Sequence, residues 1–167
     1  MSSVINTFDG PYAFLSNFYP CPVVFDGLTY PTSEHAYQAA KSTDRDYQLR
    51  ICYSAATPAK AKRLGRKAVL RPNWEAVKCR AMYYILEQKF KPGTELAQRL
   101  LSTNGHELVE GNWWGDVYWG RCRGVGENNL GKLLMRLRDQ LKATTQDTPK
   151  ETGTHDTKAS NRYPVRP

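Results

Sequence analysis

Long hydrophobic runs are absent from this 167-residue sequence, although 40% of its residues are apolar. No stretch approaches the roughly 18 uncharged apolar residues that a membrane-spanning helix needs. The N-terminal residues also lack the apolar segment of a secretory leader. We therefore expect a protein that does not enter a membrane and that acts in the cytoplasm.

Paired cysteines are absent as well. The four cysteines stand far apart in the sequence, at Cys21, Cys52, Cys79 and Cys122. None belongs to a Cys-x-x-Cys pair or has a pair of histidines nearby, and this spacing matches no common zinc site. We expect no metal and no cofactor, and free thiols that pack as small apolar groups in a reducing, intracellular compartment.

Acidic residues are scarce relative to basic ones. The chain has 16 Asp and Glu against 24 Lys and Arg, which gives a net charge of +8. Residues 143–167 hold four basic and three acidic residues, so seven of the eight net charges belong to residues 1–142. This excess indicates either a partner that carries phosphate groups or a basic surface that is merely solvated.

Large apolar side chains become rare towards the C-terminus. Between Ala143 and Pro167 only Tyr163 and Val165 are large and apolar. They bury too little surface to offset the entropy lost on ordering the segment. The sequence predicts one folded domain over residues 1–142 and a flexible tail over residues 143–167.

The folded part combines few strands with several helices. Asp26 and Gly27 separate two short apolar runs, which predicts a hairpin of residues 23–25 and 28–30. Residues 107–110 read as a short strand. The fold class is therefore α+β, mainly helical, in a single compact domain with a few short strands. Capping residues and apolar spacing predict helices over residues 33–42, 44–55, 58–65, 73–90, 95–101 and 129–142.

The first predicted helix carries a row of polar side chains. Glu34, Gln38 and Lys41 are four and three residues apart, so a carboxylate, an amide and an amine share one helix face. Alanines occupy much of the remaining surface, which favours tight packing of this helix. The row is either one wall of a site or a polar stripe exposed to solvent.

The loop of residues 111–128 is rich in tryptophan and glycine. Its large flat side chains on a mobile backbone suit stacking on a base, although each tryptophan could instead fill the core. Asp116 is its unusual residue, an acid among aromatic residues and arginines. The tryptophans and glycines are Trp113, Trp114, Trp119, Gly115, Gly120, Gly124 and Gly126.

Two further clusters add a basic surface and an aromatic one. Six lysines and arginines fall within residues 60–71, followed by Lys78 and Arg80, and such a surface attracts phosphate groups or is simply solvated. The segment 14–20 places aromatic residues around Asn17, a pattern that by itself indicates core.

Several segments form an ordered set along the chain. These are residues 14–20 (FLSNFYP), 33–41 (SEHAYQAAK), 61–66 (AKRLGR), 74–78 (WEAVK), 89–90 (KF), 116–120 (DVYWG) and 124–135 (GVGENNLGKLLM). In this order the set resembles the NADAR (YbiA-like) family over about residues 8–141. The resemblance implies a compact, mainly helical domain that acts as an N-glycosidase without a metal.

Members of the family hydrolyse bonds between ribose C1 and an amine nitrogen. Their substrates are ribosylamine intermediates of riboflavin synthesis or guanine that carries ADP-ribose. Carried onto this chain, the resemblance implies Glu34, Lys41 and Asp116 as catalytic residues. Together with the clusters above, it implies that the substrate contacts Phe14, Asn17, Phe18, Gln38, Arg66, Trp74, Lys78, Trp119, Gly120, Gly126 and Asn128.

Cleavage of a C1–N bond builds positive charge on the sugar. We therefore expect a carboxylate, Glu34 or Asp116, to activate water and to stabilise that charge. Lys41 either forms a Schiff base with C1, if burial or a cationic neighbour lowers its pKa, or makes an ion pair with Glu34.

The remaining side chains of the implied site are expected to hold the substrate. Phe14 and Phe18, with the tryptophans, would clamp the planar base. Arg66 and Lys78 would hold phosphates.

The sequence thus predicts hydrolysis of a phosphorylated ribosylamine. An ADP-ribosyl guanine adduct stands ahead of the riboflavin intermediate, and nucleic acid is a second candidate partner. One rival is a module that binds ADP-ribose or nucleic acid without turnover, but such a binder gains nothing from two carboxylates near its phosphates. Another is a basic structural nucleic-acid protein, whose affinity would fall steeply with salt. The sequence leaves the oligomeric state open.

Overall fold

A computed structural model describes residues 3–146 of the chain. Most of the predicted tail, residues 147–167, lies outside the described residues. Within residues 3–146 the strands are β1 (Val4–Ile5), β2 (Pro20–Phe25), β3 (Leu28–Thr32), β4 (Glu107–Leu108), β5 (Gly111–Asn112) and β6 (Arg121–Cys122). The helices are the 3-10 helix η1 (Gly10–Leu15) and α1 (Ser33–Ala40), α2 (Arg45–Ser54), α3 (Pro58–Gly65), α4 (Trp74–Lys89), α5 (Glu95–Ser102) and α6 (Asn129–Gln146).

Four helices begin at residues whose side chains cap them. The oxygens of Thr32, Asp44, Thr57 and Thr94 accept hydrogen bonds from backbone N–H groups in the first turns of α1, α2, α3 and α5. The predicted helix starts are confirmed to within one residue. They could be predicted because these caps depend on residues close together in the sequence.

The last helix runs further than the sequence indicates. α6 continues to Gln146, so residues 143–146 are helical and not part of a tail. Extending an existing helix is easier than starting one, because each added residue gains one hydrogen bond while only that residue is fixed. The Thr145 hydroxyl also donates to the carbonyl of Leu141.

The predicted hairpin is confirmed. β2 and β3 pair antiparallel, with Phe25 opposite Leu28 and Val23 opposite Tyr30. Asp26 and Gly27 both have positive φ angles, 47° and 75°, as a two-residue turn between twisted strands requires. The predicted strand over residues 107–110 is shorter, because only Glu107 and Leu108 find a partner strand, in β1.

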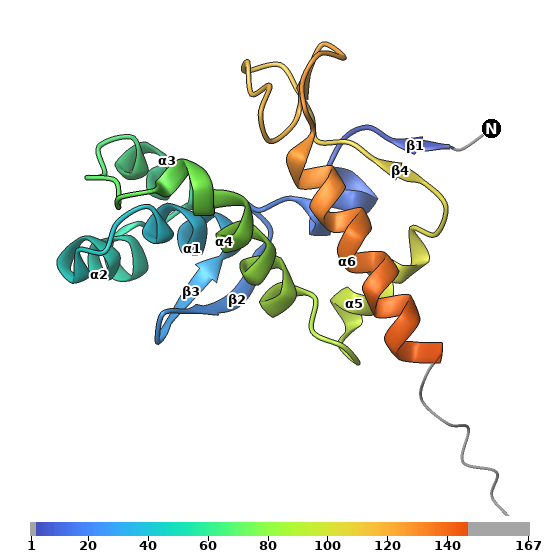
Figure 1. The fold of residues 1–167 in the computed structure, drawn as a ribbon, viewed down its shortest axis with the longest axis horizontal. Coiled ribbons are helices and arrows are strands. Elements are labelled where there is room, and N and C mark those ends of the chain that lie inside the picture. Colours follow the sequence, from blue (N-terminus) through green and yellow to red (C-terminus); the bar gives the residue numbers. More distant parts are fainter. Residues whose placement is uncertain (1–2, 147–167) are drawn as a thin grey trace, which may run out of the picture.

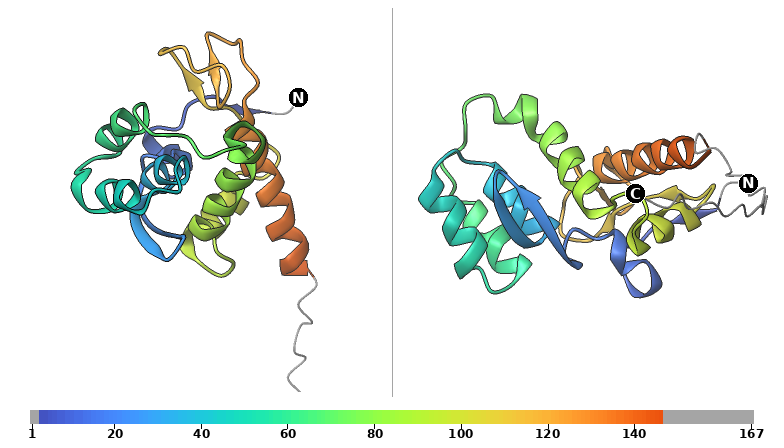
Figure 2. Two further views of the ribbon diagram at one scale, coloured as in Figure 1. Left: turned by 60° about the vertical axis from the view of Figure 1, so that its left-hand side comes forward. Right: turned by 90° about the horizontal axis from the view of Figure 1, so that it is seen from below.

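α4 runs through the middle of the molecule (Figure 1). The hairpin and α1 to α3 lie on one side of it, and α5, α6 and the β1–β4 pair lie on the other. Figure 2 shows the same division from two further directions. α4 contacts α1, β2 and α6. This central position predicts strong coupling between the two halves.

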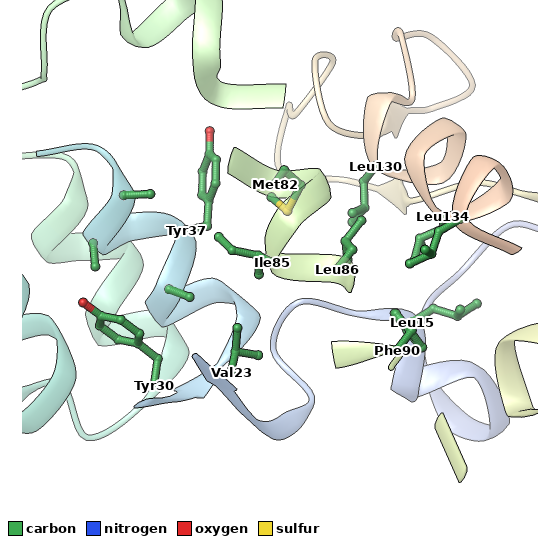
Figure 3. Close-up of a cluster of buried hydrophobic side chains, with 14 of the residues drawn as sticks. Leu15, Val23, Tyr30, Tyr37, Met82, Ile85, Leu86, Phe90, Leu130 and Leu134 are labelled. Atoms are coloured by element: carbon green, nitrogen blue, oxygen red, sulfur yellow. The ribbon is translucent and has the colours of Figure 1, made fainter. Parts of the chain in front are cut away.

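The core follows α4 from one half to the other. Ile85 and Leu86 are fully buried there, between Val23 of the hairpin and Leu130 of α6 (Figure 3). Tyr37 also belongs to this cluster, and its hydroxyl points away from Ile85. Tyr37 therefore packs its ring in the core while its hydroxyl is directed away from the core residue Ile85.

The loop of residues 109–128 projects beyond the helices, at the top of Figure 1. β5 and β6 pair in parallel within it. The backbone N–H groups of Asn129 and Leu130 donate to the carbonyls of Tyr118 and Trp119, which fixes the loop to the start of α6. No helix within residues 3–146 is long and apolar enough to cross a membrane.

Candidate active site

A cavity of about 550 Å³ lies between α1, α3, α4 and the loop of residues 109–128. This volume is in the usual range for small-molecule sites. Eight of its fourteen lining residues are among those expected from the sequence, namely Asn17, Phe18, Glu34, Gln38, Lys41, Arg66, Asp116 and Trp119. The other six are Ser16, Tyr37, Lys62, Met82, Glu110 and Trp114.

α1 supplies the polar wall of the cavity. All eight of its residues are buried, so its polar row is not a stripe exposed to solvent. Ala36, Ala39 and Ala40 are fully buried and let neighbouring elements approach closely. The same close approach is seen at Gly65 of α3, where a Cβ would overlap the Gln38 amide.

Glu34 is the most deeply buried acid of the cavity. Its side chain accepts a hydrogen bond from Gln38 Nε2 at 2.6 Å, and the residue is only 6% exposed. Burial raises the pKa of Glu34, and the nearby Asp116 charge adds to this effect. The Gln38 hydrogen bond and the charges of Lys62 and Lys41 act in the opposite direction.

Lys41 stands at the C-terminal end of α1. Its Nζ donates to the Gly65 carbonyl at 3.5 Å and lies 5.8 Å from the centre of the Tyr37 ring. Burial lowers the pKa of Lys41, and the charges of Lys62 and Arg66 lower it further, against the effect of Glu34. The ion pairs within the described part of the chain are Lys78–Glu75 and Arg121–Glu107, so the expected alternative of a Glu34–Lys41 pair is not formed.

Asp116 enters from the opposite wall. Its Oδ1 accepts hydrogen bonds from the backbone N–H groups of Tyr118 at 3.1 Å and Trp119 at 2.8 Å. The Asn112 side chain holds the Asp116 backbone, receiving its N–H at 3.1 Å and donating to its carbonyl at 2.7 Å. The carboxylate therefore has a fixed orientation at a turn of the loop.

A third carboxyl group, that of Glu110, was not identified from the sequence. Burial raises the pKa of Glu110 to about 8, and the charges of Asp116 and Glu34 raise it further, while Lys62 opposes them. Its Oε2 is buried and has no hydrogen-bond partner among residues 3–146. The available signal was its position directly after Leu108 and Val109, because two buried apolar residues imply that the next side chain also starts near the interior.

Aromatic side chains close one end of the cavity around Tyr37. Trp119 Nε1 donates to the Tyr37 hydroxyl at 3.2 Å, and the two rings meet edge to face with centres 5.3 Å apart. Phe18 and Trp114 line the cavity and are 40% and 51% exposed, and Lys62 Nζ lies 5.6 Å from the centre of the Trp114 ring. Trp113, at 81% exposure, lies outside it. Of the three tryptophans of the loop, Trp114 and Trp119 line the cavity and Trp113 does not.

Comparison with known proteins places the chain in a family. The model of the NADAR domain matches residues 5–142. The chain belongs to the NADAR family. Its relatives include N-glycosidase YbiA of Escherichia coli, 44% identical over 133 residues that cover 78% of this chain and 82% of that protein. The solved NMR structure of E. coli YbiA has a TM-score of 0.81 and 39% identity, and it covers 92% of this chain and 93% of that one.

A second type of relative is a longer protein. A riboflavin biosynthesis protein of Vibrio vulnificus is 38% identical over 136 residues, which cover 80% of this chain but only 36% of that protein. The NADAR domain therefore occurs both in N-glycosidases of similar length and as part of larger proteins.

Three predicted substrate contacts of this NADAR domain lie outside the cavity because other groups hold them. Lys78 forms an ion pair with Glu75 and lies 3.7 Å from the centre of the Tyr118 ring. Phe14 is buried in edge contact with Phe90. Trp74 is buried behind Tyr37, with ring centres 5.4 Å apart, and supports the cavity wall from the core side.

Three further predicted contacts shape the loop of the NADAR domain and do not line its cavity. Asn128 Nδ2 donates to the Leu108 carbonyl at 2.9 Å, and its Oδ1 accepts the Glu110 N–H at 3.0 Å. A Cβ at Gly120 would overlap the Glu110 carbonyl, and one at Gly126, where φ is 144°, would overlap the Gly120 carbonyl.

The charged groups of the cavity come from two sides. Lys62 of α3, Arg66 directly after α3, and Lys41 supply three cations, and Glu34, Glu110 and Asp116 supply three acids. Within residues 3–146, no group of three or more His, Cys, Asp or Glu side chains is arranged to hold a metal ion.

Proposed function

We propose that this protein is an N-glycosidase that hydrolyses the ribose C1–N bond of a phosphorylated ribosylamine without a metal, and that guanine carrying ADP-ribose is its substrate. The observation that supports this most directly is the meeting of Lys41, Glu34 and Asp116 in one cavity with aromatic faces. Relatives that match this chain over most of their length are named N-glycosidases.

Lys41 is suited to act as the nucleophile. Burial lowers its pKa, and within residues 3–146 no carboxylate forms an ion pair with it, so both effects favour the uncharged amine that a nucleophile requires. A ribosylamine can open to an imine at C1. In our proposal the Lys41 nitrogen adds to C1, the C1–N bond to the base breaks, and a Schiff base joins C1 to Lys41.

Water then completes the reaction. A water oxygen adds to C1, a carboxylate removes its proton, and the bond between C1 and Lys41 breaks to release the sugar. Asp116 has the fixed orientation that this role needs, and Glu34 lies on the same wall as Lys41. The net change is one water consumed for one base and one sugar released.

The cations at the C-terminal end of α3 favour a diphosphate. Lys62 and Arg66 line the cavity beside Lys41, and their charges attract phosphate oxygens. Phe18 and Trp114 provide flat faces for an adenine or guanine ring. A riboflavin-type ribosylaminopyrimidine phosphate is the second candidate, because the same domain occurs in proteins named for riboflavin biosynthesis.

The test offers both substrate types to the purified full-length chain, with and without a chelator. We expect release of free base from the ADP-ribosyl guanine adduct, unchanged by the chelator and abolished in Lys41→Ala. Lys67→Ala, which changes an exposed lysine outside the cavity, is the matched control. Borohydride should trap a covalent sugar on the wild type but not on Lys41→Ala. Binding of ADP-ribose without any base release would instead support a non-catalytic binding module.

A further inference from the structure

We propose that Glu110 is a catalytic residue that donates a proton to the nitrogen leaving C1, an inference that rests on the proposed function. The leaving group of this reaction needs a proton donor. An amine leaves carbon very poorly as an anion, so its nitrogen must receive a proton as the bond breaks. One carboxyl group of the cavity must therefore be kept as an acid while another acts as a base.

The backbone of Glu110 is held on several sides. Its N–H donates to Asn128 Oδ1 at 3.0 Å, and its carbonyl accepts the Arg121 N–H at 2.9 Å. Gly120 packs against the same carbonyl with no room for a side chain. Because these contacts fix the main chain, the side chain of Glu110 is directed to the cavity that it lines. Asn128 and Gly120 therefore contact the main chain of Glu110 and do not line the cavity.

The carboxyl group of Glu110 differs from those of Glu34 and Asp116 in its hydrogen bonding. Glu34 accepts a hydrogen bond from Gln38, and Asp116 accepts two from backbone N–H groups. Glu110 Oε2 is buried and, within the described part of the chain, has no partner. Donors stabilise an ionised carboxylate, and their absence favours the protonated form. A buried O–H without an acceptor in the protein is available to an acceptor on the substrate.

The surrounding charges act in the same direction. Glu34 of α1 and Asp116 of the loop face Glu110 and disfavour a third negative charge, while Lys62 of α3 opposes them. With burial, these charges raise the pKa of Glu110 to about 8, so the group is mostly protonated at neutral pH. Burial raises the pKa of Glu34 as well, but Glu34 accepts the Gln38 hydrogen bond, which stabilises its ionised form, and Glu110 has no such donor among the described residues.

Proton transfer from Glu110 accompanies the cleavage of the C1–N bond. The electron pair of the breaking C1–N bond goes to nitrogen, and the Glu110 proton goes to the same nitrogen, which leaves as a neutral amine. Glu110 becomes a carboxylate. It regains a proton when water adds to C1 and gives one up, either through Asp116 or through solvent.

The main variant is Glu110→Gln, which keeps the shape of the side chain but has no acidic proton. We expect kcat for amine release to fall by about 10²- to 10⁴-fold with little change in KM. Glu107→Gln is the matched control, because Glu107 precedes it by three residues and pairs with Arg121 on the surface. The control should keep the wild-type kcat. Thermal unfolding of both variants checks that they are folded.

Two readouts separate proton donation from a structural role. Wild-type kcat should fall above about pH 8, where Glu110 loses its proton, and this fall should be missing in Glu110→Gln. The loss of rate in the variant should also be smaller for ribosyl-4-nitroaniline 5-phosphate than for ribosylaniline 5-phosphate, because the nitro compound leaves more easily.

Several results would overturn the inference. The first is a Glu110→Gln variant that keeps the wild-type kcat. The second is a fall in kcat above about pH 8 that persists in the variant, and the third is an equal loss of rate for the two aniline substrates. The wild-type pH profile needs no variant, so absence of the limb there also contradicts the proposal if Glu110→Gln does not fold. If the wild type releases no amine from any ribosylamine, the proposed function has failed. If it does so while Glu110→Gln is fully active, only the role of Glu110 has failed.

Discussion

Lys89 offers a test of the fold that is independent of catalysis. It ends α4 and is 2% exposed, and its Nζ donates to the carbonyl of Ser16, a residue of the cavity wall, at 2.7 Å. Burial lowers the pKa of Lys89 from 10.5 to about 7, with the nearby Cys21 acting in the opposite direction. Between these two pKa values Lys89 is therefore mostly uncharged in the folded protein and mostly protonated in the unfolded chain.

The size and sign of the effect follow from the two pKa values. Between pH 7 and 10.5 the unfolded state binds more protons at Lys89 than the folded state, so the free energy of unfolding rises with pH in this window. Below pH 7 the destabilisation is fully present. Each pH unit within the window is worth about 1.4 kcal/mol, so Lys89 contributes a rise of about 2 kcal/mol between pH 7.5 and 9.

The assay is urea unfolding of the wild type and Lys89→Met at several pH values. The variant lacks the rise, so its stability relative to the wild type should decline by about 2 kcal/mol from pH 7.5 to 9. Loss of the donor to Ser16 adds a cost of about 1–3 kcal/mol that does not depend on pH. Titrating groups that do not interact with Lys89, Glu110 among them, cancel in the difference. Lys132→Met, at an exposed lysine of α6, should leave the pH dependence unchanged. Parallel curves for wild type and Lys89→Met would refute the reasoning.

Three further predictions concern the other residues expected at the site. Arg66→Ala should weaken binding of ADP-ribose by about 10- to 150-fold, since a hydrogen bond to a charged group is worth about 1.5–3 kcal/mol. Lys78→Ala should leave the affinity unchanged, and calorimetry compares the two variants. Phe14→Ala should lower the free energy of unfolding by about 3–5 kcal/mol, measured in urea, because Phe14 is core and not a substrate contact. Gly126→Ala should reduce kcat, since the added Cβ displaces the backbone at Gly120 that packs against Glu110.

Local sequence signals predicted the helices better than they predicted the site. Caps at Thr57 and Thr94 specify where helices begin whatever their surroundings, and the turn at Asp26 and Gly27 specifies the hairpin. The alanines of the first helix favoured tight packing over an exposed polar stripe, and the burial of all eight residues of α1 decides between the two alternatives. These features depend on residues close together in the sequence.

The remaining features depend on contacts between distant segments. Glu110 lies in the cavity because α1, α3 and the loop come together around it, and the apolar pair Leu108 and Val109 beside it indicates burial but not these distant neighbours. Lys78 was assigned to phosphate although Glu75, one helical turn earlier, is its partner. Gly120 and Asn128 were expected to contact substrate, but they hold the main chain of Glu110.

The most direct measurement is chromatography of the products formed when the full-length protein is incubated with guanosine that carries ADP-ribose on an amine nitrogen. We expect many turnovers, each releasing one unmodified guanosine and one ADP-ribose, with Lys41→Ala inactive and Lys67→Ala unaffected. A wild-type protein that binds this compound and releases neither product would contradict the proposed C1–N cleavage.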